Sequence, residues 1–216
     1  MYNDLVYALP PKTAHNGSAA LTMAEFNDVY LDSQYADGGT GPTFKYELIY
    51  YPTTTSDGTP EGLKVPQPDN VVGVNINSIN TPTNKESYRW NFLIGNARGD
   101  DDYSSLIAFS QALRLNGASF VTAFSQAADV DVYLRTAAAM TLCGVVDHYS
   151  DGAQHNLKLY ARPEDGRILY LPWDHDYLAA PVTWPLVRGA DLQKVVGASV
   201  AWERAFYGHL HDLMDV

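Results

Sequence analysis

Residues 145–177 read VVDHYSDGAQHNLKLYARPEDGRILYLPWDHDY. The stretch holds several aspartates, an asparagine and three histidines, and apolar runs lie on both sides of them. Oxygen-bearing side chains at the ends of strands or helices are the ligands that a hard cation and its bound phosphates require. Because such ligands lie here beside segments able to form a core, we take this stretch as the candidate functional site.

A β-hairpin is predicted inside this stretch. Residues 157–160 alternate apolar and polar side chains, and residues 168–171 form a second apolar run. Between them, residues 162–166 are Arg-Pro-Glu-Asp-Gly, a composition typical of a turn. Antiparallel pairing of the two runs would bring Asn156 and Asp174 to the same end of the hairpin. If both bind one cation, their side-chain oxygens should lie within about 8 Å of each other.

The order of these residues is the order found in protein kinases. A kinase has a catalytic aspartate, an asparagine a few residues later, and a strand pair that ends in a metal-binding aspartate. Here Asp151 precedes Asn156, and the hairpin is followed by PWDHD at residues 172–176. This arrangement resembles the spore-coat CotH kinase family, which consists of atypical bacterial protein kinases. The resemblance is strongest over residues 120–178 and poor before residue 100.

The resemblance implies an α+β, atypical protein-kinase-like fold in a single domain, residues 1–216. Residues 1–99 would form a small β- and loop-rich region that corresponds to an incomplete N-terminal lobe. Residues 100–216 would form the helical lobe, with the site hairpin at residues 147–177. The implied activity is ATP-dependent phosphoryl transfer to Ser or Thr hydroxyls of a protein substrate.

The same resemblance assigns roles to individual residues. Asn156, Asp174 and Asp176 would bind Mg²⁺ or Mn²⁺ and, through the metal, ATP. The catalytic aspartate stays open between Asp147 and Asp151. Asp151 has the kinase-like spacing to Asn156, whereas Asp147 directly follows an apolar helix end. We favour Asp147, because packing fixes a position at a helix end while loop spacing tolerates insertions.

Two other functions fit the same stretch. In a metal-dependent hydrolase, His148, His155 and His175 would join the aspartates around a transition metal, which imidazole suits. These histidines show neither the i, i+4 spacing nor the strand alternation common among ligand pairs, which weakens this hypothesis. In a non-catalytic scaffold or calcium-binding domain, residues 150–152 would be ordinary turn formers.

Length and composition narrow the class of protein further. The chain has 216 residues, 46% of them hydrophobic, which predicts one globular domain with a sizeable core. Its net charge of -11 argues against nucleic acid or an anionic membrane as a partner. The single cysteine, Cys143, excludes an internal disulfide. We find no membrane-spanning stretch and no signal peptide; the resemblance alone suggests an extracellular, cell-surface or spore-associated location.

A kinase also needs a lysine on an N-terminal strand and a loop that covers the phosphates. The glycines of residues 37–42 read as a turn and not as such a loop. Lys45, within the predicted strand 43–51, and Lys64, among prolines, are the candidate lysines, and neither has the expected setting. We therefore expect the chain to be part of a longer protein with its ATP-binding lysine upstream.

The remaining elements follow from local patterns. Residues 23–31 fit a helix or a strand, and residues 53–70 form a long loop rich in Pro and Gly. Further strands are predicted at residues 71–79 and 88–94. Helices are predicted after the acidic residues 100–102, from a cap at Asp131, and over the C-terminal residues 192–213.

Overall fold

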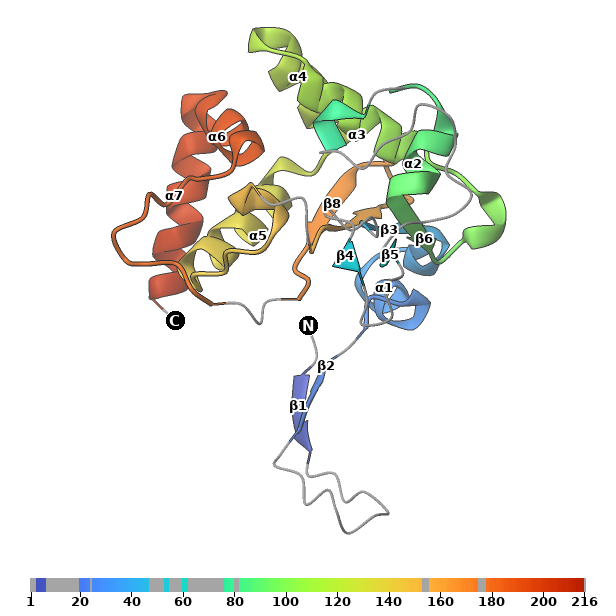
Figure 1. Ribbon diagram of the computed structural model, residues 1–216, viewed down its shortest axis with the longest axis horizontal. Coiled ribbons are helices and arrows are strands. Elements are labelled where there is room, and N and C mark those ends of the chain that lie inside the picture. Colours follow the sequence, from blue (N-terminus) through green and yellow to red (C-terminus); the bar gives the residue numbers. More distant parts are fainter. Residues whose placement is uncertain are drawn as a thin grey trace.

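The structure is a computed structural model that describes residues 3–6, 20–23, 25–46, 53–54, 60–61, 76–79, 82–152, 156–174 and 178–215. These residues form an α+β fold with seven α-helices and a four-stranded antiparallel sheet (Figure 1). The α+β class predicted from the sequence is therefore confirmed.

The four-stranded sheet joins the two halves of the chain. Its strands run in the order β6-β3-β7-β8. They are β3 (Thr43–Tyr46), β6 (Phe92–Gly95), β7 (Lys158–Ala161) and β8 (Ile168–Leu171). Two short ribbons pair β1 (Asn3–Val6) with β2 (Ala20–Met23) and β4 (Thr53–Thr54) with β5 (Pro60–Glu61). The predicted N-terminal strand and the site hairpin thus belong to one sheet.

The predicted hairpin is confirmed as β7 and β8. Lys158 lies opposite Leu171 in an antiparallel register. Gly166 closes the turn with a φ of 69°, a left-handed conformation that glycine adopts without strain. The guanidinium of Arg162 contacts Asp165 at 2.7 Å and Asp129 at 3.0 Å. Asp129 is the N-cap of the helix Val130–Leu142. Arg162 therefore connects the hairpin turn to the helical part of the protein.

All helices except the first contribute to the large core cluster, which packs on one face of the sheet. The helices are α1 (Asp28–Gln34), α2 (Lys85–Asn91), α3 (Ser104–Arg114), α4 (Gly117–Ala127), α5 (Val130–Leu142), α6 (Ala190–Gly197) and α7 (Val200–Met214). Helices α5, α6 and α7 lie together in Figure 1, and α5 also contacts β8. Tyr133 on α5 joins the sheet to α4, because its ring lies 5.6 Å from that of Tyr170 and 5.4 Å from that of Phe124.

The opposite face of the sheet carries a smaller cluster. Tyr160, Leu169 and Leu171 on the hairpin pack with Leu31 on α1 and with Phe26 before it. The Tyr160 hydroxyl donates a hydrogen bond of 2.9 Å to the Gly38 carbonyl. This contact holds α1 and the turn after it against β7, and it leaves the neighbouring part of the same face free to form a pocket.

Two strand predictions were wrong in part. Residues 88–91 belong to α2, and only Phe92–Gly95 is a strand. The helix begins because the Asn84 side chain accepts a hydrogen bond from the Glu86 amide, a cap that outweighs the strand propensity of the following aromatics. In the predicted strand 71–79, Ile76–Ser78 is a 3-10 turn and residues 71–75 lie outside the described residues.

The helical predictions hold with shifted boundaries. The Asp102 carboxylate accepts a hydrogen bond from the Ser104 amide where α3 begins. Gly117 is the first residue of α4. The cap of α5 is Asp129, whose carboxylate accepts from Val132, and Asp131 lies in the first turn. The C-terminal helices are confirmed as α6 and α7.

Gly189 allows the loop at residues 150–152 to pack closely against the start of α6. The Gly189 amide donates to the Ser150 carbonyl at 3.2 Å, and a β-carbon on Gly189 would lie 2.6 Å from the Gly152 nitrogen. We expect Gly189→Ala to lower the free energy of unfolding by about 1–3 kcal/mol, because backbone atoms must move. Gly208→Ala in α7 is the matched control: among the described residues, no atom outside the surrounding helix backbone lies within 4 Å of the added β-carbon, so it should stabilise the helix by about 0.5–1 kcal/mol. Equal urea midpoints for the native chain and Gly189→Ala would contradict this packing.

Candidate functional site

The site lies where the hairpin strands meet the segment after α5. Asn156 precedes β7, and Asp174 follows β8. Their φ angles are 48° and 57°, in the left-handed region that few non-glycine residues adopt. Asn and Asp tolerate this conformation best, and strained backbone of this kind is concentrated at functional sites.

The Asn156 side chain joins three segments. Its Nδ2 donates to the Asp147 carbonyl at 3.0 Å and lies 3.3 Å both from Asp147 Oδ2 and from the Asp174 carbonyl. Three acceptors around one nitrogen fix the orientation of the amide, so Oδ1 points away from them. The structure therefore brings Asp147, Asn156 and the Asp174 main chain together. A cation shared by the Asn156 and Asp174 side chains stays a prediction, because the contact involves the Asp174 carbonyl.

Asp147 contributes a buried oxygen with unused bonding capacity. Its Oδ1 has no hydrogen-bond partner among the described residues and is shielded from solvent. A buried carboxylate oxygen without a partner loses its hydration without compensation, which costs free energy. An oxygen held in this way is suited to accept a proton or to bind a cation.

Asp151 is placed differently. Its carboxylate forms an ion pair with Arg188, and the two side chains are 10% and 14% exposed. Burial raises the pKa of the Asp151 carboxyl, and the hydrogen bond and charge of Arg188 oppose that rise. Arg188 Nη2 also approaches the Val145 carbonyl at 3.4 Å. Asp151 thus fastens the turn Tyr149–Asp151 to the segment before α6.

We expect this ion pair to contribute to stability. Arg188→Met should lower the free energy of unfolding by about 2–3 kcal/mol, because it leaves the Asp151 carboxylate largely buried and unpaired. The matched control is Arg135→Met, which removes an arginine from the pair with Asp131, whose side chains are 63% and 57% exposed. That change should cost less than about 0.5 kcal/mol. Chemical denaturation of both variants checks the difference, and equal losses would show that Arg188 has no special role.

The histidines give the hydrolase hypothesis no support within the described residues. His148 is 1% exposed; its Nε2 lies 2.9 Å from the Val145 carbonyl and its Nδ1 lies 2.8 Å from Ser150 Oγ. Both ring nitrogens therefore face protein atoms. His155, His175 and Asp176 lie outside the described residues. Within the described part of the chain, no group of three or more His, Cys, Asp or Glu side chains is arranged to hold a metal.

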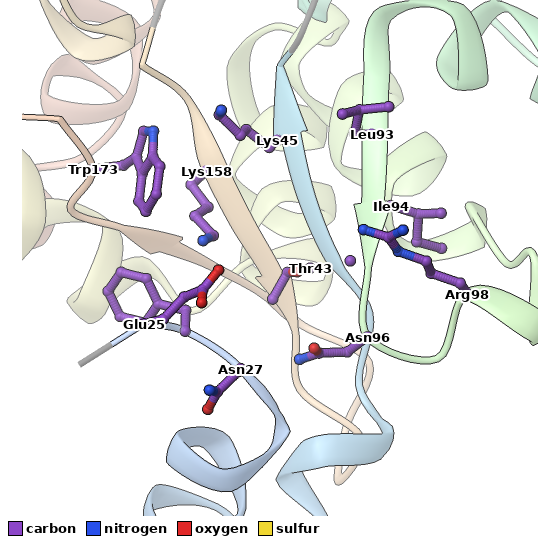
Figure 2. A pocket seen from close by; sticks show the side chains of 12 residues that line it. Glu25, Asn27, Thr43, Lys45, Leu93, Ile94, Asn96, Arg98, Lys158 and Trp173 are labelled. Carbon is purple, nitrogen blue, oxygen red and sulfur yellow. The ribbon is translucent and has the colours of Figure 1, made fainter. Parts of the chain in front are cut away.

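A pocket of about 300 Å³ lies on the sheet face that carries the smaller cluster (Figure 2). One of its lining residues, Trp173, directly precedes Asp174 of the site. The lining includes Lys45 on β3, Lys158 on β7, Asn96 after β6, and Trp173. Lys45 was a candidate from the sequence, whereas Lys158 and Asn96 were missed. The polar position of Lys158 in an alternating strand was visible in the sequence, but its neighbours depend on a strand register that no local pattern specifies.

Three further expectations from the sequence concern Cys143, membrane spans and the candidate lysines. Cys143 is exposed at the end of α5. Among the helices that the structure describes, none has the length and apolar character needed to cross a membrane. Lys64 lies outside the described residues, so Lys45 is the candidate lysine whose surroundings are known.

The fold and the site define an α+β protein with carboxylate and amide groups gathered at the open end of a β-hairpin. The family described as CotH kinase protein matches residues 67–204, which is more than half of the chain. The chain belongs to the CotH kinase family. The match includes both candidate aspartates and the hairpin, and it begins well before residue 100, earlier than expected from the motifs. No curated protein and no solved structure matches the chain.

Proposed function

We propose that this chain carries out phosphoryl transfer from ATP, with Mg²⁺ or Mn²⁺, to Ser or Thr hydroxyls of a protein substrate. The observation that supports the proposal is the Asn156 side chain, which contacts both Asp147 and the Asp174 carbonyl at the end of the hairpin. These residues lie within the segment matched by the CotH kinase family. We also propose that α5, the hairpin, α6 and α7 correspond to the helical lobe of a kinase-like fold.

The side chains at the site fit a magnesium ion. Asn156 Oδ1 points away from its hydrogen-bonded nitrogen, and the Asp174 side chain is exposed. With Asp176 they would hold the metal, and all three offer oxygen ligands, which Mg²⁺ prefers to softer donors. Bound metal would neutralise charge on the ATP phosphates.

Asp147 is the proposed general base. Its carboxylate follows α5, and Asn156 Nδ2 lies 3.3 Å from Oδ2, which restrains the orientation of the carboxyl group. Oδ1 is then the atom that would accept the hydroxyl proton of the substrate. Asp151 is already paired with Arg188, so we assign it the positioning of the loop between α5 and the hairpin.

The metal requirement gives the first test of this function. Transfer of radiolabelled γ-phosphate to a Ser/Thr-containing protein should stop when EDTA removes divalent cations, and Mg²⁺ or Mn²⁺ should restore it. Zn²⁺ should not replace them, because the proposed ligands are oxygen atoms. Calorimetric titration offers a decisive contrast: tight Zn²⁺ binding without nucleotide, lost in a His155→Ala and His175→Ala double variant, would favour the hydrolase instead.

A further inference from the structure

A buried carboxylate at the start of α6 holds the loop that carries Asp147. Asp191 lies in the first turn of α6 and is 8% exposed. Its Oδ2 accepts a hydrogen bond of 2.7 Å from the hydroxyl of Tyr149, which follows Asp147 by two residues and is itself buried. Asp191 thus contacts the loop through a side chain, in addition to the contacts of residues 188–189 described above.

The second oxygen of the Asp191 carboxylate is bound by a distant segment of the chain. Oδ1 accepts a hydrogen bond of 2.5 Å from the side-chain amide of Asn77. Asn77 belongs to the 3-10 turn Ile76–Ser78, and the Ile76 carbonyl accepts a hydrogen bond from the Ser110 hydroxyl on α3. The turn is therefore attached to α3. Because each of its oxygens has a donor, the Asp191 carboxylate cannot rotate without losing a hydrogen bond.

The burial of this carboxylate makes both donors important. Burial raises the pKa of Asp191, whereas the hydrogen bonds from Tyr149 and Asn77 and the charge of Lys194 act in the opposite direction. A buried carboxylate without hydrogen bonds loses its hydration uncompensated, which costs free energy. Hydrogen bonds to charged groups contribute about 1.5–3 kcal/mol each, which is enough to favour one conformation of the side chain strongly.

The residue between Asp147 and Tyr149 is also held in place. Both ring nitrogens of His148 contact protein atoms, and the side chain is buried. The loop around Asp147 therefore has little freedom between the end of α5 and the turn Tyr149–Asp151. A displacement of the Tyr149 side chain would move the backbone of that turn and, with it, the Asp147 carboxylate.

We propose that Asp191 is a positioning residue for Asp147, whose carboxylate it orients through Tyr149, and that Asn77 holds Asp191 in place. The inference rests on the proposed function, in which Asp147 accepts the proton of the substrate hydroxyl. A misplacement of about 1 Å can lower the rate of an enzymatic step about 10²-fold. Asp191 could not be recognised from a local pattern, because acidic residues are common in the first turn of any helix.

Tyr149→Phe removes only the hydroxyl that contacts Asp191. We expect kcat for transfer of γ-phosphate from ATP to fall at least about tenfold, while KM for ATP stays at the native value, because the displaced group is the base and not a nucleotide ligand. Asp191→Asn is a weaker test, because its amide can accept from Asn77 and donate to the Tyr149 oxygen.

Tyr88→Phe is the matched control. Tyr88 on α2 is as buried as Tyr149, and its hydroxyl donates to the Pro82 carbonyl at 2.8 Å. The control therefore removes the same group and one buried hydrogen bond, but at a place that does not contact the loop. It should lower the urea midpoint of unfolding about as much as Tyr149→Phe and leave kcat at the native value.

A second background separates positioning from a general loss of structure. If Tyr149 acts through Asp147, Tyr149→Phe should lower kcat little further in a chain that already carries Asp147→Asn. Asn77→Ala keeps the proposal testable if Tyr149→Phe does not fold: it should lower kcat several-fold in the native background and leave it unchanged beside Asp147→Asn. A native kcat in either folded variant, or equal losses in both backgrounds, would overturn the proposal.

Hydrogen exchange of the full chain tests the restraint without a catalytic readout. In Tyr149→Phe, the amides of residues 148–152 should exchange at least about tenfold faster, while those of α7 keep their native rates. Unchanged exchange at residues 148–152 would overturn the positioning role even in an active chain. Faster exchange in a chain that transfers no phosphate would refute the proposed function and still support the restraint that Asp191 places on the loop.

Discussion

The Asp174→Asn variant is expected to transfer γ-phosphate from ATP at least about 10³-fold more slowly than the native chain. The proposed role of Asp174 is to hold the metal that neutralises charge developing on the phosphates, and asparagine lacks the negative charge needed for it. The fold should survive, because the two side chains are nearly isosteric and asparagine also accepts the φ of 57° found here. Initial rates at saturating ATP and magnesium give the effect on kcat.

Asp37→Asn is the control for this measurement. Asp37 is exposed, has a φ of 52°, and lies before the turn Gly38–Thr40, outside both the hairpin and the segment that follows α5. The exchange of aspartate for asparagine is thus the same in chemistry and in backbone conformation, and transfer should stay at the native rate. Undiminished transfer by a folded Asp174→Asn protein would exclude the proposed metal role, and loss of folding would indicate a structural one.

The second large effect is expected for Asp147→Asn. A general base contributes about 10²–10⁴ in rate, so kcat should fall by a factor in this range while KM for ATP changes little. Thermal stability should be maintained, because asparagine keeps the shape of the side chain and puts a neutral amide where a buried carboxylate oxygen has no hydrogen-bond partner among the described residues. The comparison of kcat, KM and unfolding temperature separates a role in proton transfer from a role in folding.

Asp151→Asn distinguishes the two candidate aspartates. Its carboxylate is paired with Arg188, so this variant should lose stability but keep most of its kcat at a temperature where it is folded. The reverse result, a folded Asp151→Asn protein with a large loss of kcat beside an active Asp147→Asn protein, would transfer the role of base to Asp151.

The elements predicted correctly from the sequence are those with local signals. Residues 157–160 and 168–171 alternate or form apolar runs on either side of a turn, and they pair as expected. The errors arose where a single side chain redirected the backbone. Asn84 begins a helix in a segment of high strand propensity, and Asp129, not Asp131, accepts the capping hydrogen bond of α5.

The same distinction, between local signals and contacts across the chain, applies to the site residues. The proximity of Asn156 to Asp174 follows from the hairpin and could be predicted. The pairing of Asp151 with Arg188 could not, because it joins loops far apart in the chain and depends on how α6 packs. Lys45 and Lys158 face each other only because β3 lies next to β7, and a single sequence contains no signal for that register.

The position of β3 also defines the unit that must fold. Strand β3 lies between β6 and β7, yet it precedes residue 67, where the family match begins. A protein trimmed to the matched residues would leave two neighbouring strands with unpaired backbone groups, which favour association between molecules. Formation of the central pair also requires contacts between residues far apart in sequence, a topology that slows folding. The residue at which the family match begins is therefore not the residue at which the folding unit begins.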